Sequence, residues 1–133
     1  MADLDPEVRY TVHHQWLRLL PDNLARIGIS DFAQDSLGDV ISVSLPSVGD
    51  AVVAGEPFGE VESTKSESEV YAPVSGTVTS VNDLLSDSPE VINDDPYGDG
   101  WLLEVRVDPA RREPTSGELK LLTSDEYQSL TEG

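Results

Sequence analysis

A single lysine lies within the acidic run 60–69, Glu-Val-Glu-Ser-Thr-Lys-Ser-Glu-Ser-Glu. The chain has only two lysines, Lys65 and Lys120, and Lys65 is the only basic residue between Arg26 and Arg106. A lysine amine can act as a Schiff-base nucleophile, but that chemistry needs burial or a neighbouring cation to depress the pKa. A carboxylate-rich tip favours a charged amine, so a Schiff-base enzyme is discounted. A solvated lysine that relieves acidic repulsion stays open at this point.

The sequence around this lysine is nearly symmetric and predicts an antiparallel hairpin. The Val-Glu-Ser of 61–63 is mirrored by the Ser-Glu-Val of 68–70. Folding the chain between Lys65 and Ser66 places these two residues at the centre of a type I turn. The predicted pairs are Val61 with Val70 and Glu62 with Glu69. Because like charges then face each other across the ladder, stability alone explains this tip poorly.

The residues exclude several kinds of chemistry. The chain has no cysteine, so it has no disulfide, thiolate metal site or cysteine nucleophile. Any thiol chemistry must therefore come from an attached group. His13 and His14 are adjacent in an expected strand and point to opposite faces, so no metal site is expected. His14 is expected to pack beside Trp16, and Trp101 to anchor the core.

The net charge is −18, from 26 acidic and 8 basic residues in a chain of 133. This charge disfavours nucleic acids and anionic membranes as partners. It favours basic partner surfaces, although solubility or adaptation to high salt explains it as well. The N-terminus is acidic and lacks the basic and apolar segments of a signal peptide, so a mature cytoplasmic form is expected, and a matured organellar form stays open. A monomer is also expected.

Period-two alternation of apolar residues predicts strands, and Gly and Pro mark the turns between them. The first expected strand is a continuous N-terminal run from Tyr10 to Trp16. Other strands are expected at 41–45, 51–53, 58–62, 70–72, 77–81 and 101–107. Helical pieces are expected at 31–37 between an N-cap at Ser30 and a stop at Gly38, after Asn82 through Leu85, and at about 124–131.

A weak internal repeat flanks the lysine. Pro-Ser-Val-Gly at 46–49 precedes it, and Pro-Val-Ser-Gly at 73–76 follows it, each close to an expected strand. The repeat indicates two similar β halves joined by the hairpin, at about 58–72. A mainly β fold follows, a flattened barrel or sandwich with short peripheral helices and a C-terminal helix.

Taken in order, these segments resemble the glycine cleavage H-protein family. Residues 62–66 (Glu-Ser-Thr-Lys-Ser) resemble its lipoylation motif. The resemblance extends over nearly the whole chain, so a single carrier domain over 1–133 of the lipoyl/biotinyl type is expected. The other matching segments are 10–16, 27–30, 32–33, 37–39, 45–46, 71–76, 81–82, 92–98, 100–101 and Tyr127.

The resemblance implies a non-catalytic carrier with lipoate in amide linkage to Lys65. Its implied partners are glycine decarboxylase, which loads an aminomethyl group, and a tetrahydrofolate-dependent aminomethyltransferase, which unloads it. Dihydrolipoyl dehydrogenase reoxidises the arm, and a lipoate ligase or a lipoyl/octanoyl transferase attaches it. A tethered group stays at high effective concentration near its carrier.

The resemblance also implies that the loaded arm folds into a cleft between the N-terminal strand and the acidic side of the hairpin. The matching hairpin acid is Glu69, which is assigned the main electrostatic role toward a cationic amine. The family's His-Glu-Trp pattern stands here as His14-Gln15-Trp16. Gln15 brings an amide without charge and is assigned a secondary role.

Four other kinds of protein share parts of this pattern. Biotin carriers place their lysine between methionines, whereas Met1 is the only methionine here. The lipoyl domains of 2-oxoacid dehydrogenases are smaller than this chain. A lipoyl-relay relative that donates lipoate to other proteins is separated poorly by sequence, and an unmodified interaction module stays open.

Overall fold

The computed structural model describes residues 8–11 and 14–107, and this part of the chain forms two antiparallel sheets. The six-stranded sheet has the order β1-β2-β3-β9-β8-β5, and the three-stranded sheet has the order β4-β6-β7. The strands are β1 (Val8–Tyr10), β2 (Gln15–Leu20), β3 (Leu24–Ile29), β4 (Val40–Ser44), β5 (Ala51–Val52), β6 (Pro57–Ser63), β7 (Glu67–Tyr71), β8 (Gly76–Val81) and β9 (Leu103–Val107). The helices are η1 (Pro21–Asn23), α1 (Asp31–Leu37), α2 (Leu84–Asp87) and α3 (Val91–Asp94).

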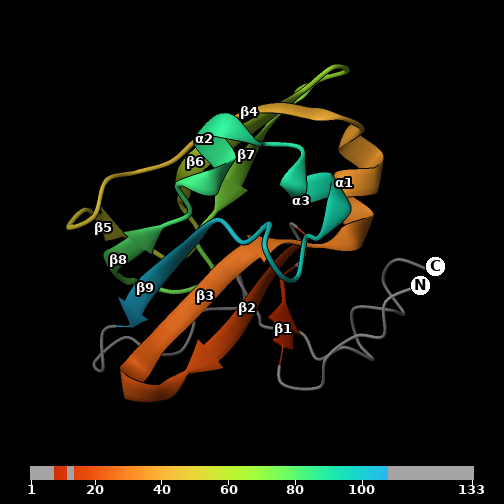
Figure 1. Ribbon diagram of the computed structural model, residues 1–133. Coiled ribbons are helices and arrows are strands. Elements are labelled where there is room, and N and C mark those ends of the chain that lie inside the picture. The colour runs from red at the N-terminus through yellow and green to blue at the C-terminus, as the bar shows by residue number, and fades with distance from the viewer. Residues whose placement is uncertain (1–7, 12–13, 108–133) are drawn as a thin grey trace.

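The inner faces of the two sheets meet in one apolar core. Ile27 and Val105 come from the larger sheet, and Val61 and Val70 come from the β6–β7 hairpin. The short helices lie at the edges, with α1 and α3 side by side near the start of β4 (Figure 1). The expected mainly β sandwich with peripheral helices is confirmed, while the helix expected at 124–131 lies outside the described residues.

The internal repeat corresponds to a real relation between the halves. The turn at 46–49 leads into β5 and the turn at 73–76 leads into β8. These two strands pair with each other, with Ala51 opposite Thr77 and Val52 opposite Gly76. The β6–β7 hairpin connects them along the chain, as the sequence predicted.

The continuous N-terminal strand is a wrong prediction, because the chain reverses within it. Tyr10 at the end of β1 lies directly opposite Trp16 in β2. His14 lies in the reversal at φ 66°, and its ring packs against Phe32 at 4.7 Å between centroids rather than in the strand beside Trp16. Alternation misled here because Tyr10 and Trp16 share a buried face in a hairpin as they would in one strand.

Strand β3 was not predicted, although Ala25, Ile27 and Ile29 alternate with less apolar residues. The interior glycine Gly28 weakens the pattern, and it is there for packing. A Cβ at Gly28 would lie 2.6 Å from the Trp16 indole, which is fully buried. Only glycine therefore lets β2 and β3 pair at this point.

Helix α1 forms as its sequence predicts. The Ser30 hydroxyl accepts a hydrogen bond from the Ala33 backbone N–H at 3.1 Å, which is N-capping geometry. The helix ends at Gly38, whose N–H donates to the Gln34 carbonyl and whose φ of 84° favours glycine. Gly38 is thus held at the position where helix α1 turns into β4.

The loop before β9 ties the N-terminal hairpin to α1. The Trp16 indole N–H donates to the Pro96 carbonyl at 2.9 Å, and the Asp31 N–H donates to the Tyr97 hydroxyl at 3.0 Å. Burial raises the pKa of Tyr97 above its ordinary value, because it disfavours the charged form of the hydroxyl. Trp101 packs half-buried at the edge of this cluster, where the Arg26 guanidinium lies 5.0 Å over its ring.

Candidate functional site

The lysine hairpin forms, but its register differs from the predicted one by two residues. Glu60 lies opposite Glu69, and Glu62 lies opposite Glu67. Thr64 and Lys65 therefore occupy the centre of the turn, in place of Lys65 and Ser66. The like-charged cross-strand pairs that the sequence predicted are present, with different members.

Ser63 sets this register. Its backbone N–H donates to the Ser66 carbonyl at 2.8 Å. Its buried hydroxyl accepts from the N–H groups of Lys65 at 3.2 Å and Ser66 at 3.1 Å, and donates to the Ser66 carbonyl. A shift of two residues leaves every side chain on the same face, so alternation does not distinguish the two registers. The side-chain hydrogen bonds within the turn distinguish the two registers.

Replacing Ser63 with alanine is expected to lower the free energy of unfolding by about 1 kcal/mol, because two turn N–H groups lose their acceptor. Urea denaturation measures this change, and amide exchange at Lys65 and Ser66 should accelerate. Ser63→Thr keeps the hydroxyl and serves as the control. An alanine variant as stable as the wild type would contradict this account of the turn.

Lys65 is exposed at the tip, and its stem runs over the end of α1. A Cβ at Gly38 would lie 2.7 Å from Lys65 Cε and 3.5 Å from Nζ. The Thr64 N–H donates to the Asp39 carbonyl at 3.0 Å. The amine is therefore accessible, while the chain beneath it is held by hydrogen bonds.

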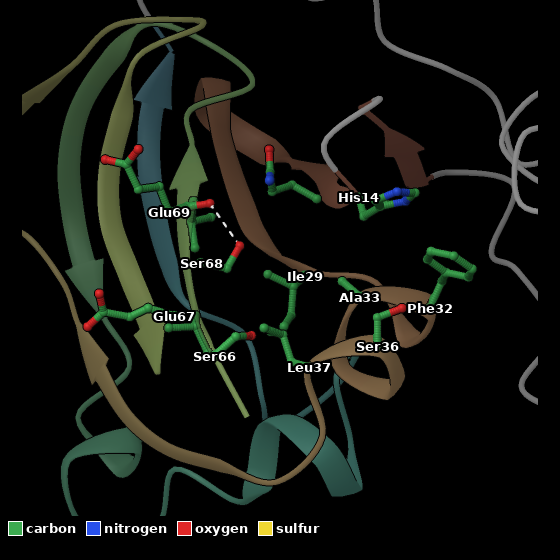
Figure 2. A pocket seen from close by; sticks show the side chains of 13 residues that line it. His14, Ile29, Phe32, Ala33, Ser36, Leu37, Ser66, Glu67, Ser68 and Glu69 are labelled. Carbon is green, nitrogen blue, oxygen red and sulfur yellow. Dashed lines mark hydrogen bonds between the residues drawn. The ribbon is translucent and has the colours of Figure 1, made fainter. Parts of the chain in front are cut away.

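A pocket of about 290 Å³ opens beside the tip, between β7 on one side and β2 and α1 on the other (Figure 2). Its apolar walls include Ile29, Leu37 and Val70, and Ser66 and Ser68 line it from the hairpin. Leu37 and Ser66 are chain neighbours of Gly38 and Lys65. A group attached to the lysine would therefore start at the edge of this pocket.

Glu69 borders this pocket, but its carboxylate lies on the other face of β7. Figure 2 shows the carboxylates of Glu67 and Glu69 pointing away from the side that Ile29 and Leu37 occupy. The Tyr71 hydroxyl donates to Glu69 Oε1 at 3.3 Å. Strand alternation sets this direction, so the Glu69 charge lies at the rim of the pocket and not inside it.

Gln15 lines the same pocket from β2 and is buried. Its Oε1 accepts a hydrogen bond from the Thr11 hydroxyl at 3.1 Å, and its backbone N–H donates to Thr11 Oγ1 at 3.3 Å. The structure thus brings Gln15 and Glu69 to one pocket next to Lys65. The sequence alone did not identify Ser66 or Ser68 as pocket-lining residues. They alternate with Glu67 and Glu69 along the chain, and this alternation could have placed them on the face opposite the carboxylates.

Within residues 8–11 and 14–107, no three His, Asp or Glu side chains are placed to hold a metal ion. In the same ranges, no helix is long and apolar enough to cross a membrane.

Comparisons with known proteins agree with the resemblance found in the sequence. The family model described as "Glycine cleavage H-protein" matches residues 8–133. The chain is 58% identical over 110 residues to a glycine cleavage system H protein from Mycobacterium avium, covering 83% of each protein. It is 54% identical over 108 residues to the one from Mycobacterium tuberculosis, covering 81% of each.

A solved structure agrees as well. The crystal structure of a glycine cleavage system H protein from Mycobacterium marinum superposes with a TM-score of 0.84 at 40% identity. The superposition covers 98% of this chain and all of the other. Sequence and fold thus agree over nearly the full length, which separates this chain from biotin carriers and from 2-oxoacid dehydrogenase lipoyl domains. The chain belongs to the glycine cleavage H-protein family.

Proposed function

We propose that this chain is a lipoyl carrier whose arm is attached to Lys65. It shuttles an aminomethyl group from glycine decarboxylase to the tetrahydrofolate-dependent aminomethyltransferase, and dihydrolipoyl dehydrogenase reoxidises it. The observation that supports this most is the position of Lys65, exposed at a hydrogen-bonded hairpin tip beside an apolar pocket. The carrier itself catalyses no step, and residues 1–133 act as one carrier domain. A cytoplasmic, monomeric protein stays a prediction from the sequence.

The residues around Lys65 fit lipoate. Amide formation needs an accessible amine, and Lys65 is exposed. An acyl chain needs an apolar surface when it folds back, and Ile29, Leu37 and Val70 supply one. When attached, lipoate supplies the redox-active sulfur that a cysteine-free chain lacks. The rigid scaffold then presents one tip to several enzymes in turn.

Thiol labelling tests this proposal. After reduction, protein expressed with lipoate and a lipoate ligase should react with a maleimide, because the attached group carries two thiols. The apo protein should not react, since no cysteine is present. A ligase-treated protein that stays inert after reduction would mean that lipoate is not attached, and the proposal would fail.

Glu69 and Gln15 are proposed to dock the loaded arm. Gln15, fixed by Thr11, forms a polar wall of the pocket. Glu69 supplies negative charge at the rim, from the far face of β7. Because the carboxylate is exposed, its attraction for a cationic amine is modest.

Glu69→Gln is therefore expected to speed spontaneous release of ammonia and formaldehyde from the loaded carrier by roughly twofold to fivefold. Gln15→Glu should slow it. Glu60→Gln is the matched control, since Glu60 lies opposite Glu69 on the same sheet and outside the pocket lining. Equal rates for Glu69→Gln and Glu60→Gln would remove Glu69 from the docking site and leave the carrier assignment intact.

A further inference from the structure

Asn93, on α3, makes hydrogen bonds that hold together two segments far from it in the sequence. Its Oδ1 accepts from the Val40 backbone N–H at 2.9 Å. Its Nδ2 donates to the Gly38 carbonyl at 2.8 Å and to Gln34 Oε1 at 3.0 Å. One half-buried carboxamide thus joins the last turn of α1 to the first residue of β4.

The residues that Asn93 holds support the lysine hairpin. We call residues 38–40 the ledge. The Asp39 carbonyl accepts from the Thr64 N–H at 3.0 Å, and Val40 pairs with Ser63 across the β4–β6 ladder. The hairpin tip is therefore bonded to the middle and to the end of the ledge.

The stem of Lys65 runs over Gly38, the first residue of the ledge. Gly38 has a φ of 84°, and a Cβ there would come within 2.7 Å of Lys65 Cε. Glycine adopts this backbone conformation without strain, and a larger residue would make the exposed lysine stem move aside. The carbonyl of this same glycine is one of the groups that Asn93 binds.

We propose that Asn93 is a positioning residue for Lys65, because it fixes the ledge to which the hairpin tip is bonded and over which the lysine stem runs. The inference rests on the proposed function of Lys65 as the attachment site. Asn93 does not touch the amine. It acts through Gly38 and Val40, and it determines where the amine is presented to the enzyme that modifies it.

Asn82 provides a matched control. Its Nδ2 donates to the carbonyls of Asp99 and Trp101, both at 2.7 Å, and its Oδ1 accepts from the Leu84 N–H at 3.2 Å. It therefore makes the same number of side-chain hydrogen bonds as Asn93, with none of them to the ledge. Removing either carboxamide breaks three side-chain hydrogen bonds, but only the removal of Asn93 releases the ledge.

The test compares Asn93→Ala with Asn82→Ala in lipoylation of the full chain by a lipoate ligase, well below the melting temperatures. Asn93→Ala should lower kcat/KM about tenfold, mainly through kcat, because the amine is misplaced in the ligase site. Asn82→Ala should match the wild type. Acetylation of Lys65 by a small activated ester should be equally fast in all three proteins. Equal lipoylation by both variants, whether fast or slow, overturns the proposal.

Backbone exchange separates this inference from the proposed function. In unmodified protein, Asn93→Ala should accelerate amide exchange at Thr64, whose N–H is bonded to the ledge, and Asn82→Ala should not. If wild-type protein is not lipoylated, the proposed function fails, and Thr64 exchange still decides the role of Asn93. Unchanged exchange at Thr64 in Asn93→Ala contradicts it.

A glycine pair tests the path of the stem. Gly38 and Gly55 have φ values of 84° and 88°, so alanine strains the backbone at both. A Cβ at Gly55 meets nothing within 4 Å, whereas one at Gly38 meets Lys65. Gly38→Ala should slow lipoylation about tenfold and Gly55→Ala should not. Equal rates would show that the stem does not depend on the ledge.

Discussion

Lys65→Arg is expected to abolish carrier activity in glycine decarboxylation with the partner enzymes, down to the background measured without carrier. Arginine keeps the positive charge and the long stem, but a guanidinium does not form the amide to lipoate. Because Lys65 is exposed, the variant should unfold at the wild-type temperature. Activity assays and thermal unfolding together distinguish loss of the arm from loss of the fold.

Lys120→Arg is the control, since Lys120 is the only other lysine in the chain. This variant should retain wild-type activity. Activity that survives in Lys65→Arg and disappears in Lys120→Arg would assign the attachment site to Lys120 instead. Activity that survives in both would show that Lys65 is not the required attachment site.

Gly28→Ala is expected to lower the free energy of unfolding by about 3 kcal/mol. The new methyl group would lie within 2.6–2.7 Å of three indole atoms of Trp16, far inside van der Waals contact. The indole has little freedom to move, because it is fully buried and its N–H is bonded to Pro96. Urea denaturation at neutral pH measures the loss.

A double variant tests whether the indole is the cause. Trp16→Phe removes the part of the ring that Gly28 touches, at its own cost in packing and hydrogen bonding. Combined with Gly28→Ala, the total loss should be smaller than the sum of the two single losses. Strict additivity would show that the added methyl group acts on the β3 backbone instead.

Much of the fold follows from local patterns in the sequence. Ser30 and Gly38 bound α1 through capping and a positive φ, and both act within a few residues of the chain. The strands β4 to β9 overlap the predicted ranges, since alternation records which face is buried. Alternation does not record where a strand reverses, so β1 and β2 were merged. The alternation in β3 is interrupted by Gly28, which makes room for the Trp16 indole, so this strand was not predicted.

The sequence identified several residues of the site, but it predicted their arrangement less well. Lys65 stands out because basic residues are absent around it, and Gln15 and Glu69 both border one pocket, with the Glu69 carboxylate on the far face of its strand. The register depends on the Ser63 hydroxyl, which no face pattern encodes. The side on which the Glu69 carboxylate lies follows from that strand's alternation, with Val70 buried and Glu69 exposed. Asn93 acts through tertiary contacts 53 and 55 residues away in the sequence, which local reasoning does not reach.

The central claim is that Lys65 carries the arm, and tryptic peptide masses test it directly. In apo protein, trypsin should cut after Lys65 and yield separate peptides 27–65 and 66–106. Lipoylation removes the charge that trypsin recognises, so the modified protein should yield one peptide, 27–106, heavier by one lipoyl group. A mass gain on the peptide that contains Lys120, with cleavage after Lys65 unaffected, would contradict the account.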